Sequence, residues 1–197
     1  MSASVRTAGA RPVAALLAVL ALLGVPGCAV AVAGEPAAPA GTAPAVDYRD
    51  PRGRFALELP PGWVPDPGHP GPEVVFLDAP AVADPLARLA SPAIEVRVRD
   101  WPGDLGRAVD TFRPTLGAPG PAESDRPVTL PDGTPAHLFA DTVPGGAGAG
   151  SAQRELQVFA VARGRLVTAT ARGATGEWDG YGTAVFETAV RSLTLGG

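Results

Sequence analysis

The chain has a single cysteine, Cys28, and no lysine, so all 16 of its basic residues are arginine. One thiol cannot form an intramolecular disulfide, and an exported domain built from this chain must therefore be held together by packing. The formal charge is −4 at pH 7, and removing residues 1–27, which carry two arginines and no acid, makes it −6. Such a mildly acidic domain lacks the clustered positive charge that nucleic-acid binding requires, so we expect no nucleic-acid partner.

Histidine is almost as scarce as cysteine. His69 lies in a segment rich in proline and glycine, and His137 lies on a predicted strand. A zinc site needs three or four converging histidine, cysteine or carboxylate ligands, and neither histidine has such neighbours at metal-ligand spacing. We predict no metal and no cofactor.

Motifs for nucleophilic catalysis are missing as well. Ser151 follows Gly148-Ala149-Gly150, but it leads into a predicted strand rather than a helix, so the geometry of a nucleophile elbow fails. The glycine run 145–150 joins two predicted strands and is followed by no lysine, which favours a hairpin connection over a phosphate loop. Paired-carboxylate catalysis stays open, because its partners can meet only in the fold. We expect no enzyme, with an uncharacterised hydrolase as the alternative.

The N-terminal segment indicates export. Arg6 and Arg11 precede the apolar run 12–23, which has the length of a secretory signal and is too short to span a bilayer. Cys28 follows directly after Val25-Pro26-Gly27, an arrangement that resembles the bacterial lipobox, in which the thiol is acylated and the peptide is cut just before it. We predict a signal peptide at 1–27 and a lipid anchor at Cys28 on the extracytoplasmic face of the cell membrane. Because Pro26 is unusual in a lipobox, an ordinary cysteine near a signal-peptidase site is the alternative.

The next segment, 28–46, has the composition of a tether. It is rich in alanine, proline and glycine, and it contains one charge, at Glu35, and no aromatic side chain. At about 3.1 Å per residue, some 18 extended residues reach roughly 50 Å from the membrane. The remaining 47–197 have the usual size of one domain with a sufficient core, and we expect a monomer.

Alternating apolar residues predict strands at 54–60 and 93–100, and a continuous apolar run bounded by turn residues predicts another at 73–78. The alternation at 93–100 is the cleanest, with Ile94, Val96 and Val98 facing inward and the charged residues between them facing outward. This strand should have one buried and one solvated face.

Two helices and two hairpins complete the predicted elements. Apolar residues at helical spacing predict a helix over 105–113, capped by Asp104 and stopped by Pro114, and another over 178–193. Asp132-Gly133 and Arg163-Gly164 predict hairpin turns that join strands 126–130 to 135–143 and 153–162 to 165–172. The strand-rich order predicts an α+β fold, an antiparallel β-sheet flanked by helices.

The segment Phe55-Ala56-Leu57-Glu58-Leu59-Pro60-Pro61-Gly62-Trp63 resembles the opening strand of the Mog1/PsbP-like fold. Together with the predicted lipobox, it is similar to the LpqN/LpqT group of actinobacterial lipoproteins. The resemblance implies a central antiparallel sheet flanked by helices, an envelope location, no established enzymatic activity, and binding of proteins or envelope lipids. It supplies no catalytic residue.

The three tryptophans, Trp63, Trp101 and Trp178, are either core anchors or a ligand platform. Trp63 and Trp101 both lie at strand ends beside loops rich in proline and glycine, which suggests that they line one apolar mouth.

We therefore expect a tethered domain that binds an envelope protein or lipid. A hydrolase would instead require titratable groups with perturbed pKa values in a pocket, and a structural spacer would have no pocket.

Overall fold

The computed structural model describes residues 44–69, 73–115, 124–143 and 152–196, which all belong to one compact unit, 37–197. The predicted signal peptide, Cys28, the tether up to residue 43, the glycine run and Ser151 lie outside the described residues. Val46, which the sequence placed at the end of the tether, is the first residue of a strand. No helix in the described part of the chain is long and apolar enough to cross a membrane.

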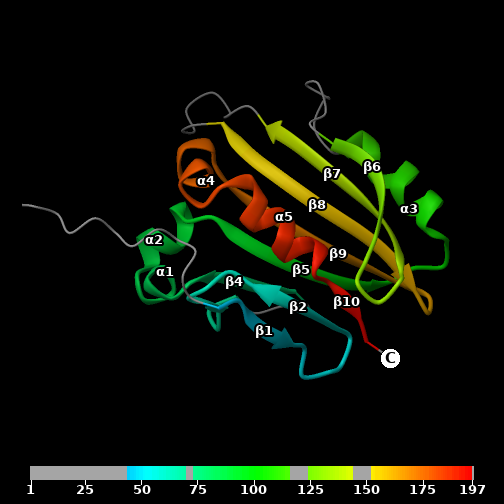
Figure 1. Cartoon of the computed structure of the whole chain (residues 1–197), viewed down its shortest axis with the longest axis horizontal. Helices are drawn as coiled ribbons and strands as arrows, with labels where there is room; N and C mark the ends of the chain where they lie inside the picture. Colours follow the sequence, from blue (N-terminus) through cyan, green and yellow to red (C-terminus); the bar gives the residue numbers. More distant parts are fainter. Residues whose placement is uncertain (1–43, 70–72, 116–123, 144–151, 197) are drawn as a thin grey trace, which may run out of the picture. The chain divides into compact units, whose positions relative to one another are not determined.

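The strands form two antiparallel sheets (Figure 1). The larger sheet has the order β3-β4-β5-β9-β8-β7-β6, and its strands are β3 Trp63–Pro65, β4 Val74–Asp78, β5 Ala93–Asp100, β6 Ser124–Thr129, β7 Pro135–Val143, β8 Gln153–Ala162 and β9 Arg165–Ala174. The smaller sheet has the order β1-β2-β10, with β1 Val46–Arg49, β2 Phe55–Leu59 and β10 Thr194–Leu195. The helices are α1 Ala79–Ala83, α2 Pro85–Ala90, α3 Leu105–Phe112, α4 Thr175–Tyr181 and α5 Thr183–Arg191, with a 3-10 turn η1 at Arg113–Thr115. The predicted α+β class is confirmed.

Both predicted hairpins are present. Gly133 has φ +83° in the β6–β7 turn, and Asp132 accepts a hydrogen bond from the Thr134 amide at 2.9 Å. In the β8–β9 turn Arg163 and Gly164 both have positive φ, 53° and 72°, as the favoured two-residue hairpin turn requires. Each turn fixes the register of its two strands.

The C-terminal helix differs from the prediction. Instead of one helix over 178–193, the chain forms α4 and α5, and the break falls at Gly182, which has φ +84°. Such a left-handed residue ends a helix and is readily adopted only by glycine. Trp178 and Phe186, one in each helix, still stack on one another with ring centroids 4.1 Å apart.

Six short elements were not predicted: β1, β3, α1, α2, η1 and β10. Helix α2 shows why, because it buries no residue, and Leu86 and Leu89 are 79% and 85% exposed. No apolar stripe marks it in the sequence, and its start depends on Asp84, whose side chain accepts a hydrogen bond from the Leu86 amide at 2.8 Å.

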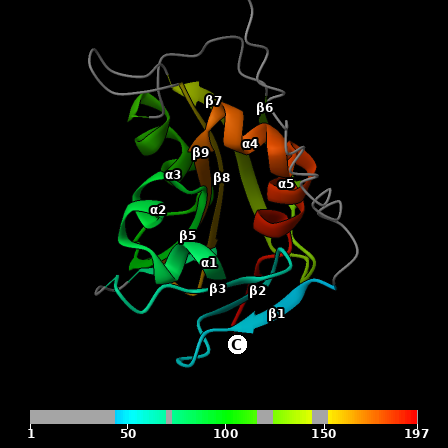
Figure 2. The same cartoon turned by 90° about the vertical axis from the view of Figure 1, so that its left-hand side faces the viewer.

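Helices cover both faces of the seven-stranded sheet, with α4 and α5 on one side and α1, α2 and α3 on the other (Figure 2). We call the first side the packed face. The main hydrophobic core lies there, between the sheet, α4, α5 and β2, and includes Phe76, Val96, Val158 and Phe186, all fully buried. We call the second side the open face. It has two smaller apolar clusters, one under α3 around Phe159 and one under α1 and α2 around Leu77.

Candidate functional site

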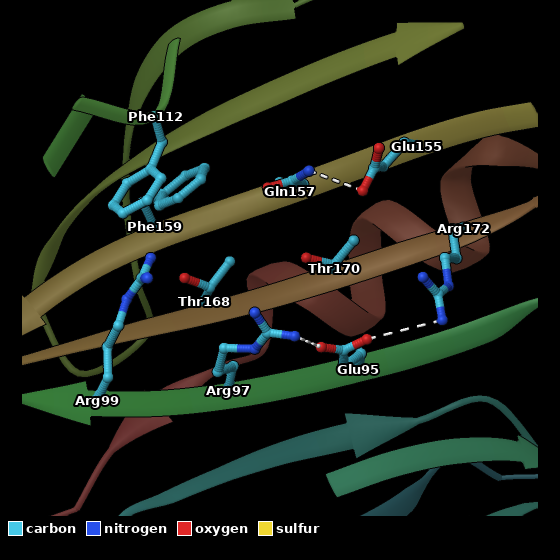
Figure 3. Close-up of a pocket in the computed structure, with 10 residues that line it drawn as sticks. All are labelled: Glu95, Arg97, Arg99, Phe112, Glu155, Gln157, Phe159, Thr168, Thr170 and Arg172. Atoms are coloured by element: carbon cyan, nitrogen blue, oxygen red, sulfur yellow. Dashed lines mark hydrogen bonds and ion pairs between the residues drawn. The ribbon is translucent and has the colours of Figure 1, made fainter. Parts of the chain in front are cut away.

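A polar hollow of about 300 Å³ lies on the open face (Figure 3). Its walls come from three neighbouring strands and from α3: Glu95, Arg97, Arg99, Phe112, Glu155, Gln157, Phe159, Thr168, Thr170 and Arg172. The volume is at the lower end of the range for small-molecule sites, about 300–1,000 Å³. It suits a headgroup or a few residues of a peptide.

Strand register brings these residues together. Thr170 on β9 pairs directly with Glu95 on β5 and with Gln157 on β8, so the three side chains form a row across the sheet. The next row consists of Arg97, Thr168 and Phe159. Directly paired residues of an antiparallel sheet point to the same face. The alternation that buries the packed face therefore turns these polar side chains outward.

Most charges in the hollow are paired with one another. Glu95 contacts Arg97 at 2.9 Å and Arg172 at 3.8 Å, and Arg97 also contacts Glu73 at 2.7 Å. This network holds the side chains of β5 and β9 in place along one wall. A partner would have to compete with these ion pairs to bind there.

Arg99 is different, because it has no ion pair with any residue that the structure describes. Its guanidinium carbon lies 4.1 Å from the ring centroid of Phe112, a cation–π contact, and its buried Nε has no hydrogen-bond partner among those residues. Burial and, second, the like charge of Arg97 lower the pKa of Arg99. A cation that is partly desolvated and lacks a carboxylate is well placed to receive an anionic group.

Glu155 forms the opposite wall. Burial raises the pKa of Glu155, and this effect outweighs the hydrogen bond that Gln157 Nε2 donates to its Oε1 at 2.7 Å and the nearby charge of Arg172. A carboxyl in this position keeps its proton to higher pH than an exposed one. It can therefore act as a donor or an acceptor.

Thr168 and Thr170 lie on the floor of the hollow (Figure 3). Neither hydroxyl makes a hydrogen bond to another part of the described chain. The floor thus offers two small groups that can donate or accept, beside the cation of Arg99 and the edge of Phe159. No serine, cysteine or histidine is among the described residues of the lining. This set of groups can bind a polar, partly anionic ligand.

The structure does not bring Trp63 and Trp101 together. Trp63 is 1% exposed and packs in the main core, with its ring 5.9 Å from Phe186 and 5.8 Å from Tyr181. Trp101 belongs to the cluster under α3 on the open face, 5.8 Å from Phe112. The seven-stranded sheet separates the two clusters, so these residues do not share a mouth.

Both histidines contact carboxylates. His137 lies 2.7 Å from Asp125, and His69 lies 3.6 Å from Glu73. Among the described residues no group of three metal-ligating side chains converges. Neither histidine lines the hollow.

The sequence contained one signal for the hollow, namely the charged side chains that alternate with the apolar residues along β5. Glu95, Arg97 and Arg99 were recognised as the solvated side of a half-buried strand, yet nothing local indicated that β9 and β8 complete the surface. Strand β5 pairs with β9, about 70 residues later in the chain, and not with β6.

No protein-family model matches the sequence, and no curated protein matches it. Solved structures do share the architecture. LpqN of Mycobacterium tuberculosis superposes with a TM-score of 0.57, over 78% of this chain and 91% of LpqN, at 14% sequence identity. The domain shares its fold with LpqN.

Two further structures cover a similar share of this chain but superpose on it less well than LpqN does. Cyanobacterial PsbP from Synechocystis sp. PCC 6803 gives a TM-score of 0.48 over 82% of this chain and 99% of its own, at 17% identity. The Saccharomyces cerevisiae Ran-binding protein Mog1p gives 0.46 over 77% and 95%, at 11% identity. Identities this low concern the fold alone.

Proposed function

We propose that this domain is a non-enzymatic binding module of the cell envelope, tethered by a lipid at Cys28, and that its partner docks in the polar hollow. The observation that carries the proposal is Arg99, a partly buried cation without a carboxylate, beside the two unengaged hydroxyls of Thr168 and Thr170. Buried polar groups normally have partners, and a ligand would supply them.

The chemistry of the hollow defines the partner. It should carry an anionic group for Arg99 and neighbouring polar atoms for the threonines and for Gln157. A protein segment with a carboxylate and an envelope-lipid headgroup both meet this description. Support for an envelope role comes from LpqN, which has the same fold and is described as involved in cell envelope biogenesis.

The test is capture of partners from native membranes with lipids retained. We would compare the wild-type chain with Arg99→Gln and with Arg191→Gln, a matched control on the exposed side of α5. Arg99→Gln should weaken binding of the captured protein or lipid about tenfold, as loss of an anchoring arginine typically does, and Arg191→Gln should leave it unchanged. Equal binding by all three chains would place the partner elsewhere, and capture of nothing specific would favour a structural spacer.

The anchor needs its own test. Cys28→Ala should release the protein from the membrane and remove the mass of the acyl chains, because covalent lipid supplies about 0.8 kcal/mol for each buried CH₂. A Cys28→Ala protein that stays fully in the membrane fraction with the same lipid mass would contradict the anchor.

A hydrolase is the second candidate, and the raised pKa of Glu155 is the observation that favours it. Glu155 would serve as the general acid and Glu95, on the other side of Arg172, as the second carboxylate. A substrate screen that finds turnover, with complete loss of turnover in Glu155→Gln and normal partner capture by the same variant, would replace the binding proposal by this one.

A further inference from the structure

A second surface lies at one end of the long strands, where arginines from separate parts of the chain gather. Two adjoining hollows of about 360 and 430 Å³ share Arg52 and Arg54 from the β1–β2 turn and Arg165 from the start of β9. Arg163 lines the first hollow and Arg99 the second. We call the group Arg52, Arg54, Arg163 and Arg165 the arginine end. In Figure 1 the β1–β2 turn, the β8–β9 hairpin and β10 reach the same end of the sheets.

Two carboxylates lie beside the arginine end, Asp50 and Asp100, and only Asp50 forms an ion pair with one of its arginines. Arg54 is fully paired, with its Nε 2.7 Å from Asp50 Oδ2 and its Nη2 2.8 Å from Asp50 Oδ1. Arg52 and Arg165, in contrast, form no ion pair with any described residue, and Arg163 makes only a 3.3 Å hydrogen bond to the Gly196 carbonyl. All three are exposed.

Arginines elsewhere in the described chain usually have a carboxylate. The pairs are Arg88 with Asp66, Arg97 with Glu73 and Glu95, Arg113 with Asp125, Arg126 with Glu187, Arg154 with Asp179, Arg172 with Glu95 and Arg191 with Glu187. The chain as a whole is negative. A concentration of unpaired cations in an acidic protein is therefore a local feature that the overall charge does not explain.

The backbone fixes the arginine end. The Gly196 amide donates to the Arg54 carbonyl at 2.9 Å, and the Trp101 amide donates to the Gly164 carbonyl at 2.7 Å. Gly196 also packs so tightly on Gly53 that a Cβ would collide with its carbonyl. Arg163 has a left-handed φ of 53°. Glycine adopts this backbone conformation readily and arginine does not, so the turn carries an arginine although glycine would be less strained there.

Strands β8 and β9 each have ten residues, which span about 33 Å. Arg163 and Arg165 lie at one end, where Asp100 is the register partner of Arg165. At the other end α4 follows β9, and its Asp179 forms an ion pair with Arg154 at 3.4 Å. Of these arginines, those without an ion pair are therefore at the first end, and this is the end that a negatively charged surface would attract.

We propose that the arginine end docks on the phosphate headgroups of an anionic membrane surface. Guanidinium groups bind phosphate oxygens in bidentate geometry. The cations are spread over two turns and two adjoining hollows instead of converging on one point, which suits a layer of phosphates better than a single bound anion. A tether of about 50 Å lets an anchored domain bring this end to the membrane. This inference goes beyond the polar hollow and does not depend on what the hollow binds.

The experiment uses the full chain, as its own envelope processes it, reconstituted with vesicles that carry brominated acyl chains. Bromine quenches tryptophan at short range, and Trp101 reports on this end because its amide is bonded to the β8–β9 turn. We would compare phosphatidylcholine vesicles with vesicles that also contain phosphatidylglycerol. We expect quenching only with phosphatidylglycerol, and we expect it to disappear at high salt because the attraction is screened.

Two triple variants of equal net charge distinguish an effect of the arginine end from an effect of the protein's overall charge. Arg52→Gln/Arg163→Gln/Arg165→Gln should lower the equilibrium constant for docking by about fivefold for each arginine removed. Arg107→Gln/Arg126→Gln/Arg191→Gln removes three exposed arginines elsewhere and should quench like the wild type.

The proposal is overturned if the wild type is quenched equally in both kinds of vesicle, if it is quenched in neither, or if the two triple variants behave alike. Millimolar inorganic phosphate provides the last arm. If it abolishes docking when chloride at the same ionic strength does not, the arginine end binds a discrete phosphate group and the membrane assignment is wrong. Arg99 lines both the second hollow and the polar hollow, but both triple variants keep it, so failure here is distinguishable from failure of the proposed function.

Discussion

The two faces of the seven-stranded sheet are formed by the same strands, but they differ in burial and in polarity. On the packed face, Ile94, Val96, Val158 and Ala169 are fully buried under α4, α5 and the smaller sheet. On the open face, the residues between them form a hollow whose apolar contacts are confined to clusters at its two ends. The packed face holds the larger hydrophobic core, and the open face carries the polar side chains at which we propose that a partner binds.

The sharpest test of this contrast compares one phenylalanine from each face. Phe186→Ala should cost about 3–5 kcal/mol, because Phe186 is fully buried and contacts Trp63 and Trp178. Phe112→Ala on the partly exposed α3 should cost less, about 1–2 kcal/mol. Urea denaturation measures both, and equal losses would show that the two faces contribute alike.

Asp50 tests how the β1–β2 turn of the smaller sheet is held in shape. Its buried carboxylate accepts hydrogen bonds from the Arg54 side chain and amide, and the bond from the Arg54 side chain is the main cause that lowers the pKa of Asp50. Asp50→Asn should therefore cost about 2–3 kcal/mol at neutral pH. Because the folded pKa is below the unfolded one, the stabilisation is present above the unfolded pKa, about 3.9, and is lost as the pH falls through the folded value.

The control is Asp47→Asn, an exposed position on β1. Denaturation midpoints at pH 7 and pH 3 measure both variants. A loss in Asp50→Asn that is the same at both pH values would show that charge plays no part in it.

Glu155 should behave in the opposite way on the open face. Its folded pKa is raised by burial, so the native state keeps a proton that the unfolded chain has released. The stability of the wild type should therefore decline as the pH rises from the unfolded value, 4.5, through the folded pKa. Glu155→Gln removes this decline, and its stability relative to the wild type should increase from pH 4 to pH 8.

Denaturation at several pH values measures the effect, with the exposed Glu177→Gln as the matched control. A difference between Glu155→Gln and the wild type that does not change with pH would mean that Glu155 is solvated in the folded protein.

The smallest expected effect is a gain. Arg163→Gly should raise the free energy of unfolding by up to about 1 kcal/mol. A left-handed backbone costs a non-glycine residue about 1–2 kcal/mol. Part of this gain is offset because glycine has more conformational entropy in the unfolded chain. Thermal unfolding measures it, and Gly164→Ala at the neighbouring left-handed position should have the opposite sign. A loss of stability in Arg163→Gly would show that the arginine side chain stabilises the turn.

The fold was predictable where local patterns are strong. Strand β5 was recognised from its alternation, α3 from its apolar spacing and the Asp104 cap, and both hairpins from their glycine turns. Helices α1 and α2 were not, because α1 has five residues with one of them, Ala81, buried, and α2 buries none. The split of the last helix depends on the positive φ of Gly182, which glycine permits but the sequence alone does not reveal.

The site was less predictable, for a physical reason. Its residues occupy solvated positions on three strands, and in each strand taken alone Glu95, Gln157 or Thr170 is an ordinary surface residue. Only the pairing of β5 with β9 and of β9 with β8 makes them neighbours. The aromatic residues predicted to define a ligand mouth, Trp63 and Trp101, lie on opposite faces of the sheet. Trp63 packs against Phe186 of α5, whereas Trp101 follows the end of β5 and packs against Phe112 of α3.

The central claim, that the open face binds and the packed face does not, can be tested by one spectrum. The chain has two glutamines and no asparagine, so Gln157 and Gln153 are its only source of side-chain amide signals, and its three tryptophans give three indole signals. On addition of the captured partner to nitrogen-15-labelled protein, the Gln157 amide and the Trp101 indole should shift, while the indoles of Trp63 and Trp178 stay in place. Shifts of Trp63 and Trp178 with an unmoved Gln157 would contradict the account.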